Sequence, residues 1–382
     1  MTTILLTANT SWYLANFRSG LIRAIQDPGF HVAVLAPLDE HSGRLRALGC
    51  DFIPLQMDNK GTSPLRDARL FMTFRRQLRA LRPQAVLSFT VKNNIFCGLA
   101  ARRAKIPFLP NVSGLGTAFV TETWLTKVVT LLSRAAFRPL PLVMFQNRDD
   151  RALFITRRIV AAPNCVVVPG SGVDLAHFAP TPLPKSDVTT FLLIARLLWD
   201  KGVGEFVEAV RQLRAAGVPV RGQLLGFLDV KNRNAIDRET VDAWQAEGVI
   251  EYLGATDDVR PAIAAADCVA LPSYYREGTP RSLLEASAMG RPIITTDTPG
   301  CRDVVDDGVT GYLCALRDVA SLAQAMARFA TLPHKARSVM GQGARDKMVC
   351  EYDEAIVIDV YLRWLDQVVR KRRPRPVDFT HF

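Results

Sequence analysis

The sequence lacks the features that define several protein classes. It contains no apolar run of the roughly 18 residues that a membrane span needs. Its first residues enter a strand-like run, Ile4–Thr7, without the basic, apolar and small-residue zones of a signal peptide. Its seven cysteines are odd in number and include no Cys-x-x-Cys pair, which argues against disulfides and a zinc site. We therefore expect a cytoplasmic protein with reduced thiols.

Nucleic-acid-binding signatures are also missing, although the chain is strongly basic. The formal net charge is +11, which suits nucleic acid, an anionic membrane surface or a phosphorylated substrate. No zinc-finger, RNA-recognition or helix-turn-helix pattern accompanies this charge. We therefore expect a phosphorylated substrate or a membrane surface as partner, and no nucleic acid.

Short apolar runs alternate with amphipathic stretches along the whole chain. The amphipathic stretches include Leu14–Ile25 and Ala68–Leu81. This alternation predicts parallel sheets covered by helices on both faces, an α/β fold. The expected strands are Ile4–Thr7, His31–Ala36, Phe52–Leu55, Ala85–Phe89, Phe108–Asn111, Val143–Gln146 and Val166–Val168 in the first half, and Phe191–Ala195, Gln223–Gly226, Ile250–Leu253, Cys268–Pro272 and Ile293–Thr296 in the second.

A proline-rich stretch, Ala179–Pro184, interrupts the pattern between the two halves. A chain of 382 residues also exceeds the usual size of one hydrophobic core. We predict two doubly wound, Rossmann-like domains, residues 1–174 and 175–350. Residues 351–382 would form a helix, which can pack back on the first domain, and a basic tail. Ligands bind outside the carboxyl ends of the strands in such sheets, so two facing domains would form an interdomain cleft.

The segment Glu277–Glu285 carries the most informative pattern. We expect Thr279 to cap a helix that begins at Pro280. Free amides and Arg281 in its first turn would bind an anion. Glu277 and Glu285 lie on either side, and carboxylates accept hydrogen bonds from hydroxyl groups. The segment therefore suits a sugar nucleotide; the alternative is a solvated helix with two surface glutamates.

A second pattern follows the expected strand Phe191–Ala195. Arg196 and Lys201 flank a short loop, and Gly202 leads into a helix. A guanidinium and an ammonium at a strand end suit a diphosphate, and their effect grows as a departing diphosphate gains charge. The alternative is a surface arginine and lysine in an ordinary loop.

These motifs, with Leu253-Gly254, Leu271-Pro-Ser273 and Gly311-Tyr-Leu, resemble glycosyltransferase family 4, of GT-B fold. The resemblance implies a UDP-sugar donor, retention of anomeric configuration, and neither metal nor other cofactor. It places Arg196 and Lys201 on the donor diphosphate, Glu285 on the ribose and Glu277 on the transferred sugar. Other donor contacts would come from Gly278, Thr279, Arg281, Leu283 and Leu284 near the phosphate and from Gly226 and Gly254 near the base. The departing diphosphate oxygen would take the acceptor's proton. No histidine base is assigned.

The first half resembles a narrower group, the enzymes that extend polyprenyl-diphosphate-linked sugars for surface polysaccharides or glycans. The resemblance lies in Phe89–Asn94 and Asn111–Phe119, although that group more usually has proline where this chain has Asn93. It implies transfer of a hexose or N-acetylhexosamine to a lipid-diphosphate-linked saccharide. The alternative is a nucleotide-sugar epimerase or hydrolase of the same architecture. Expected acceptor-side residues are Asn9, Asn16, Arg18, Lys92, Gly114 and Gly116. The alternatives are a solvated Arg18 and an ordinary loop at the two glycines.

The stretch Arg66–Arg82 is amphipathic and basic. Leu70, Phe74, Leu78 and Leu81 form one stripe, and the arginines lie mostly elsewhere. Such a helix can dock on an anionic cytoplasmic leaflet, so we expect peripheral association with the inner face of the plasma membrane. The favoured account of the stripe itself is that it packs on the sheet while the arginines face water.

Overall fold

The computed structural model describes residues 2–58, 61, 63–114, 124–230, 232–275 and 277–370, with the backbone alone at 124 and 125. Within these ranges no helix is both long and apolar enough to cross a membrane. The described chain divides into two compact units. The first unit runs to Ser171 and resumes at Glu354, and the second runs from Gly172 to Asp353. The divisions expected from the sequence lie at 174 and 350.

The first unit contains a parallel sheet of seven strands in the order β3-β2-β1-β4-β5-β6-β7. The order reverses between β1 and β4, which pair directly. The strands are β1 (Thr3–Thr7), β2 (His31–Ala36), β3 (Asp51–Pro54), β4 (Ala85–Phe89), β5 (Phe108–Val112), β6 (Val143–Phe145) and β7 (Cys165–Val167).

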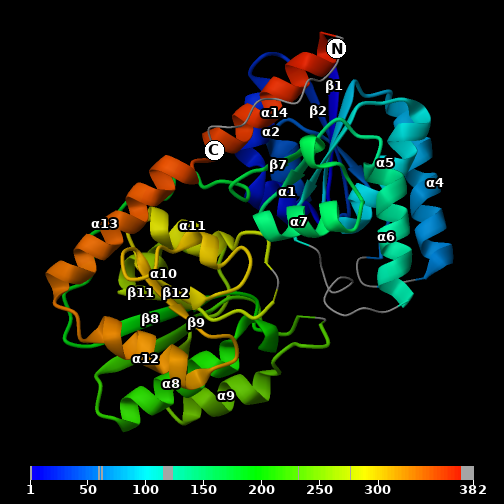
Figure 1. Ribbon diagram of the computed structural model, residues 1–382. Coiled ribbons are helices and arrows are strands. Elements are labelled where there is room, and N and C mark those ends of the chain that lie inside the picture. The colour runs from blue at the N-terminus through cyan, green and yellow to red at the C-terminus, as the bar shows by residue number, and fades with distance from the viewer. Residues whose placement is uncertain are drawn as a thin grey trace. The chain divides into compact units, whose positions relative to one another are not determined.

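Helices cover both faces of this sheet, because successive side chains of each strand point to opposite faces. The helices are α1 (Ser11–Phe17), α2 (Ser19–Gln26), α3 (Ser42–Ala47), α4 (Pro64–Leu81), α5 (Val91–Ala104), α6 (Trp124–Phe137), α7 (Arg148–Thr156) and α14 (Glu354–Val369). Ile4 and Leu6 face α1, α2 and α14, whereas Leu5 faces α4 to α7. Helices α4, α5 and α6 lie side by side (Figure 1).

Helix α4 and the pair α1 and α2 bear on two predictions from the sequence. The apolar stripe of α4 packs on the sheet, with Leu70, Phe74 and Leu78 buried, as favoured. The expected single helix Leu14–Ile25 is wrong, because the chain breaks at Arg18 into α1 and α2. The backbone there is non-helical (φ −133°, ψ 9°). Its guanidinium turns into the core, 4.5 Å from the centroid of the Phe89 ring.

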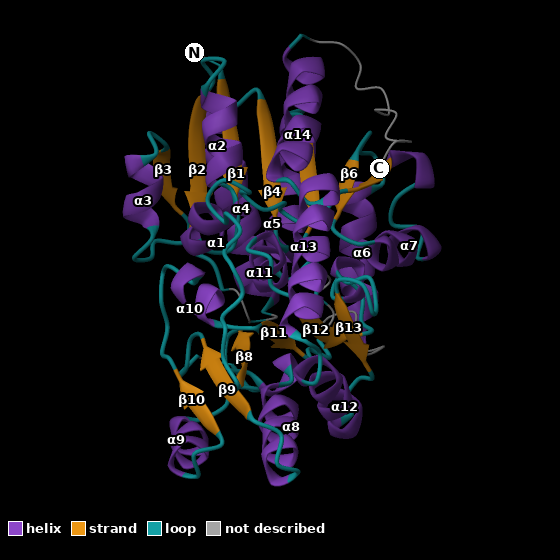
Figure 2. Cartoon of the chain, turned by 90° about the vertical axis from the view of Figure 1, so that its left-hand side faces the viewer, coloured by secondary structure: helices purple, strands orange, loops and turns teal. Residues whose placement is uncertain are grey.

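The second unit repeats the same topology with six parallel strands in the order β10-β9-β8-β11-β12-β13. Helices again flank the sheet (Figure 2). The strands are β8 (Thr189–Ile194), β9 (Val220–Leu225), β10 (Ile250–Tyr252), β11 (Cys268–Leu271), β12 (Ile293–Thr296) and β13 (Gly311–Cys314). The helices are α8 (Val203–Ala215), α9 (Arg238–Ala246), α10 (Arg260–Ala265), α11 (Arg281–Ala288), α12 (Val319–Ala330) and α13 (His334–Glu351). β13 was not among the expected strands.

The buried Arg291 links the start of the second unit to α10 by hydrogen bonds. Its guanidinium donates to the carbonyl oxygens of Thr181 (2.8 Å) and Pro182 (3.0 Å), in the proline-rich stretch. It also donates to the carbonyl oxygens of Ile263 (2.9 Å) and Ala264 (3.0 Å) around the end of α10. A planar group with five N–H donors can satisfy this many acceptors at once.

Candidate active site

The residues expected to bind a donor converge where the second sheet reverses its strand order. β8 and β11 are neighbours there, with Phe191 paired to Cys268. Arg196 and Lys201 follow β8, and Glu277 follows β11. Ligands of doubly wound sheets bind at such switch points, outside the carboxyl ends of the strands. The fold therefore places the two sequence motifs at one edge of one sheet.

Lys201 and Glu277 form an ion pair, and each side chain is only 13% exposed. The Lys201 ammonium also lies 5.5 Å from the centroid of the Tyr275 ring. The Ser273 hydroxyl donates to Glu277 Oε1 at 3.1 Å. A charged pair with little exposure interacts more strongly than one in water. Glu277 is thus not a solvated surface glutamate.

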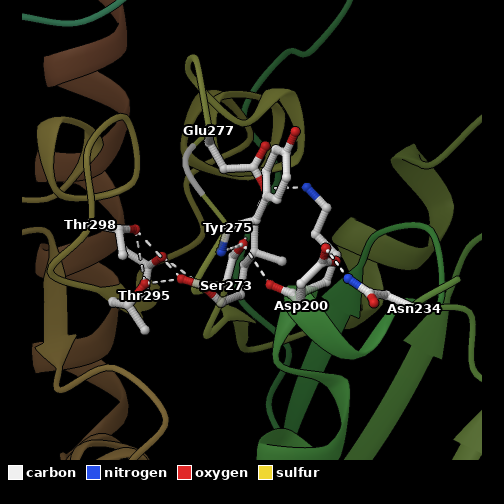
Figure 3. A network of polar contacts seen from close by, with 10 residues as sticks. Asp200, Asn234, Ser273, Tyr275, Glu277, Thr295 and Thr298 are labelled. Atoms are coloured by element: carbon white, nitrogen blue, oxygen red, sulfur yellow. Dashed lines mark hydrogen bonds and ion pairs between the residues drawn. The ribbon is translucent and has the colours of Figure 1, made fainter. Parts of the chain in front are cut away.

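Asp200 joins two loops at this edge (Figure 3). Its carbonyl oxygen accepts hydrogen bonds from the amides of Tyr274 (3.1 Å) and Tyr275 (3.2 Å). Its carboxylate Oδ2 accepts from Asn234 Nδ2 at 3.0 Å. The loop that carries Lys201 is therefore fixed both to the segment after β11 and to the segment after β9.

The loop after β12 supports the segment that carries Glu277. A Cβ atom at Gly300 would lie 1.9 Å from the Gly278 carbonyl oxygen and 2.9 Å from that of Glu277. Gly300 also has a φ of +81°, which favours glycine. Any side chain here would displace the backbone that positions Glu277.

The helix after Glu277 begins one residue later than expected. α11 starts at Arg281, and Pro280 is the N-cap, with an extended ψ of 120° and no side-chain cap hydrogen bond. The expectation that Thr279 caps a helix starting at Pro280 is wrong, because Pro280 itself is not helical. The amides of Leu283 (3.2 Å) and Leu284 (3.4 Å) donate to the Pro280 carbonyl oxygen. Both of their side chains are fully buried.

Arg281 and Glu285 face each other one turn apart on α11. Arg281 Nε donates to Glu285 Oε1 at 3.1 Å, and the two side chains are 14% and 13% exposed. Arg281 also donates to the Gly172 carbonyl oxygen. Burial raises the pKa of Glu285 above its ordinary value, and the Arg281 charge offsets part of this shift. Glu285 is thus held in place, close to the start of the helix.

Arg196, Gly226 and Gly254 are the other residues expected to contact the donor. Arg196 is exposed, unlike Lys201. Gly226 directly follows β9 and has a φ of +146°, and a Cβ there would lie 1.9 Å from the Ala195 carbonyl oxygen. Its amide donates to the Gly254 carbonyl oxygen at 2.8 Å, which joins the ends of β9 and β10. Both glycines allow conformations that other residues avoid.

Of the residues expected to contact the acceptor, Arg18 lies between α1 and α2, and Lys92 lies in the first turn of α5, which follows β4. Arg18 is only 2% exposed, so the alternative of a solvated Arg18 is wrong. It donates to the Tyr13 hydroxyl at 2.9 Å. Lys92 forms an ion pair with Asp67 at 2.8 Å and donates to the carbonyl oxygens of Asp58 (3.0 Å) and Gly61 (2.6 Å). All three ammonium donors of Lys92 thus have partners within the protein.

The remaining acceptor-side residues are partly described. Asn16 accepts from Arg44 at 3.0 Å and donates to the Trp12 carbonyl oxygen at 3.0 Å. Gly114 has a φ of +111°. Gly116 lies outside the described residues. Asn9 lies two residues after the end of β1 and is partly exposed.

Two features of the sites were not found from the sequence. Thr90, directly after β4, has a φ of +71° and a ψ of 152°, a conformation that strains a β-branched residue. Its hydroxyl donates to Asn93 at 3.0 Å, and the buried Asn93 donates to Thr7 at 2.8 Å. Ser273 belongs to the Leu271-Pro-Ser273 motif, but no role was predicted for it.

Its position four residues before Glu277 was the signal that could have indicated a contact between the two side chains.

Comparison with known proteins identifies the family. The model for glycosyl transferase 4-like domains matches residues 15–170, and the model for glycosyl transferases group 1 matches residues 188–331. The chain belongs to glycosyltransferase family 4. It is a glycosyltransferase, and the matches give no support to the epimerase or hydrolase alternative.

Two curated relatives of this glycosyltransferase match over most of their length. The first is the N,N'-diacetylbacillosaminyl-diphospho-undecaprenol alpha-1,3-N-acetylgalactosaminyltransferase of Campylobacter jejuni, 27% identical over 93% of this chain and 96% of the relative. The second is the UDP-Gal:alpha-D-GlcNAc-diphosphoundecaprenol alpha-1,3-galactosyltransferase of Escherichia coli, 25% identical over 84% of each chain.

Solved structures agree on the fold. A glycosyltransferase from Rickettsia africae superposes with a TM-score of 0.77 at 15% identity, over 97% of this chain and 99% of that one. Anabaena Alr3699/HepE, in complex with UDP and glucose, has a TM-score of 0.76 at 17% identity, over 96% and 100%. The predicted α/β, GT-B fold class is confirmed.

Proposed function

We propose that this glycosyltransferase moves a hexose or N-acetylhexosamine from a UDP-sugar to a polyprenyl-diphosphate-linked saccharide, with retention of anomeric configuration. Two ion pairs carry the proposal: Lys201 with Glu277 at the switch point of the second sheet, and Arg281 with the largely buried Glu285 in α11, the helix that follows Glu277. This arrangement offers an ammonium for a diphosphate and carboxylates for sugar and ribose hydroxyls.

The chemistry follows from the charges. The diphosphate of the donor gains negative charge as the sugar leaves, so Lys201 and the exposed Arg196 bind the transition state more tightly than the ground state. Glu277 orients the transferred sugar, and Glu285 accepts from the ribose. Gly278, Thr279 and Arg281, with the first amides of α11, contact the phosphates, and the departing diphosphate oxygen takes the acceptor's proton. In this proposal no metal and no cofactor takes part.

The relatives support the proposed substrates. Both curated relatives are named for transfer to an undecaprenyl-diphosphate-linked sugar, and one is named for UDP-galactose. One structural neighbour was solved with UDP and glucose. We propose Asn9, Asn16, Arg18, Lys92, Gly114 and Gly116 for the acceptor side. Within it, Arg18 and Lys92 act through the segments that they hold, because the Arg18 guanidinium is buried against Tyr13 and Phe89 and the Lys92 donors are already bound. The product would enter surface polysaccharide or glycan assembly.

A lipid-linked acceptor requires the enzyme to work at a membrane surface. Leu65 (75%), Met72 (54%) and Leu131 (66%) are exposed on α4 and α6. Exposed basic residues accompany them: Arg66, Arg69, Arg76 and Arg79 on α4, Arg102 and Arg103 on α5, and Lys127, Arg134 and Arg138 on or just after α6. Asp67 is the one acidic residue of these three helices, and it is paired with Lys92. We propose that this surface, named the α4–α6 face, docks on anionic lipid of the inner leaflet.

A direct assay tests the function. The protein is incubated with UDP-N-acetylgalactosamine or UDP-galactose, with and without an undecaprenyl-diphosphate-linked saccharide, and UDP release is measured. Release that depends on the acceptor supports the proposal. Equal release without acceptor would indicate hydrolysis, and no release with any pair would indicate a binding protein; either result contradicts it.

A further inference from the structure

Ser273 is a fully buried hydroxyl beside Glu277 that has no part in the roles assigned above. Its Oγ lies 3.1 Å from Glu277 Oε1 and 3.3 Å from the Asp200 carbonyl oxygen. A serine hydroxyl has one proton to donate, and a carboxylate is the stronger acceptor of the two. The shorter contact is the one to the carboxylate. Ser273 therefore restricts the orientation of Glu277.

The backbone of Ser273 is itself fixed from the neighbouring strand (Figure 3). Its carbonyl oxygen accepts from the hydroxyl of Thr296, at the end of β12. It also accepts from that of Thr298 at 3.5 Å, and Figure 3 labels this residue. The Tyr275 amide donates to the Ser273 hydroxyl at 3.3 Å. These contacts hold the hydroxyl in one place relative to the sheet. A rigidly held donor orients its acceptor without a further loss of entropy.

The Glu277 carboxylate needs the contact with Ser273 in addition to its ion pair with Lys201. The same ammonium that pairs with Glu277 is assigned above to the donor diphosphate, a doubly charged competitor for it. Ser273 carries no charge and is buried away from solvent, so a diphosphate does not compete for it. The hydroxyl can keep Glu277 in place while the ammonium is drawn to the leaving group.

We propose that Ser273 is a positioning residue, which holds the Glu277 carboxylate toward the transferred sugar during catalysis. This inference rests on the proposed function of the site. It assigns Ser273 no direct contact with substrate. Loss of the hydroxyl should impair the chemical step more than nucleotide binding, because the nucleotide is bound by Glu285 and the start of α11.

The test compares Ser273→Ala with Ser287→Ala. Ser287 is a matched control: its hydroxyl is also buried in the second unit and has no hydrogen-bond partner in the part of the chain that the structure describes. The measurements are kcat and KM for the UDP-sugar, the Kd of UDP and of UDP-sugar by calorimetry, and Tm. We expect Ser273→Ala to lower kcat about ten-fold and to leave the Kd of UDP within about two-fold. Ser287→Ala should match the wild type in all of them.

Three outcomes would contradict the inference or its basis. A wild-type kcat in Ser273→Ala would overturn it. A parallel loss of kcat, UDP affinity and Tm would also overturn it, because it would show a role in folding alone. Absence of turnover by the wild-type protein would overturn the proposed function instead. In that case the Kd of UDP-sugar and the Kd of UDP still test the role of Ser273. The inference requires Ser273→Ala to weaken the binding of UDP-sugar more than the binding of UDP.

Discussion

Arg281 and Glu285 form a largely buried ion pair one helical turn apart, with 3.1 Å between Nε and Oε1. Arg281 is further held by the Gly172 carbonyl oxygen at the start of the second unit. The pair therefore fixes the first turn of α11 from two directions. Because the pair is shielded from water, changes at Glu285 should affect both stability and nucleotide binding.

The first prediction concerns pH. Burial raises the pKa of Glu285 above its ordinary value of 4.5, so the folded protein holds this proton more tightly than the unfolded chain does. The contribution of Glu285 to the free energy of unfolding is therefore largest below pH 4.5. It falls as the pH rises from 4.5 through the folded pKa. Glutamine does not titrate, so this dependence is absent in Glu285→Gln. The Tm of the variant minus the Tm of the wild type should therefore be larger at pH 7.5 than at pH 4.5. Equal Tm differences at the two values would contradict this account.

The same substitution should separate binding from stability. We expect Glu285→Gln to weaken UDP binding by at least about ten-fold, because a neutral amide accepts more weakly from ribose hydroxyls. Calorimetric titration with UDP at pH 7.5 measures this. Glu247→Gln, at an exposed glutamate outside the site, is the control and should bind UDP as the wild type does.

The second prediction concerns the Lys201–Glu277 pair. Lys201→Ala and Glu277→Ala should each lower kcat by at least about 100-fold, a loss of about 2.7 kcal/mol in transition-state stabilisation. Circular dichroism should show an intact fold. The double exchange Lys201→Glu with Glu277→Lys keeps the ion pair but reverses its charges. If the two residues contact the diphosphate and the sugar, the exchange stays inactive; recovered activity would mean that the pair serves structure alone.

The third prediction concerns Arg291. A lysine has three donors on a flexible chain and cannot replace the planar group that contacts Thr181, Pro182, Ile263 and Ala264. We expect Arg291→Lys to lower the free energy of unfolding by about 3 kcal/mol, because buried carbonyl oxygens lose their partners. Urea unfolding measures the change. Arg221→Lys, at an exposed arginine of the same unit, is the control, and an equal effect in both variants would rule out the role given to Arg291.

The fourth prediction concerns the α4–α6 face. Reversing three exposed charges of α4, with Arg69→Glu, Arg76→Glu and Arg79→Glu, should lower binding to phosphatidylglycerol vesicles at least about ten-fold. Co-sedimentation at low and high salt measures the bound fraction. The control reverses three exposed charges of the second unit, Lys185, Arg221 and Lys335, and so changes the net charge equally. If both triple variants lose binding alike, the attraction comes from total charge and not from this face.

Much of the fold could be predicted from the sequence, because buried parallel strands appear as short apolar runs. His31–Ala36, Ala85–Phe89 and Ile293–Thr296 have the predicted bounds. β13 was missed because it begins with a glycine, a residue that is unfavourable in strands. Gly311 is needed there, since a Cβ would lie 1.9 Å from the Ile293 carbonyl oxygen. The break at Arg18 was missed because the apolar pattern continues through it.

The candidate site was predictable in its residues but not in their contacts. The spacing of Glu277 and Glu285 around a helix start indicated which residue types gather at the strand ends. The sequence could not show that Lys201 pairs with Glu277, since these residues are 76 positions apart. The sequence also could not show that Arg18 is buried. The residues on either side of an arginine do not reveal whether its side chain faces water or the core. Tertiary contacts decide both.

The most direct test of the account is the anomeric configuration of the product. The protein is incubated with a UDP-α-sugar and an undecaprenyl-diphosphate-linked saccharide in the presence of EDTA, and the new linkage is identified by NMR. The account predicts an α-linked sugar, formed by the wild-type protein and not by Glu277→Ala. A β-linked product, or a full rate in Glu277→Ala, would contradict it.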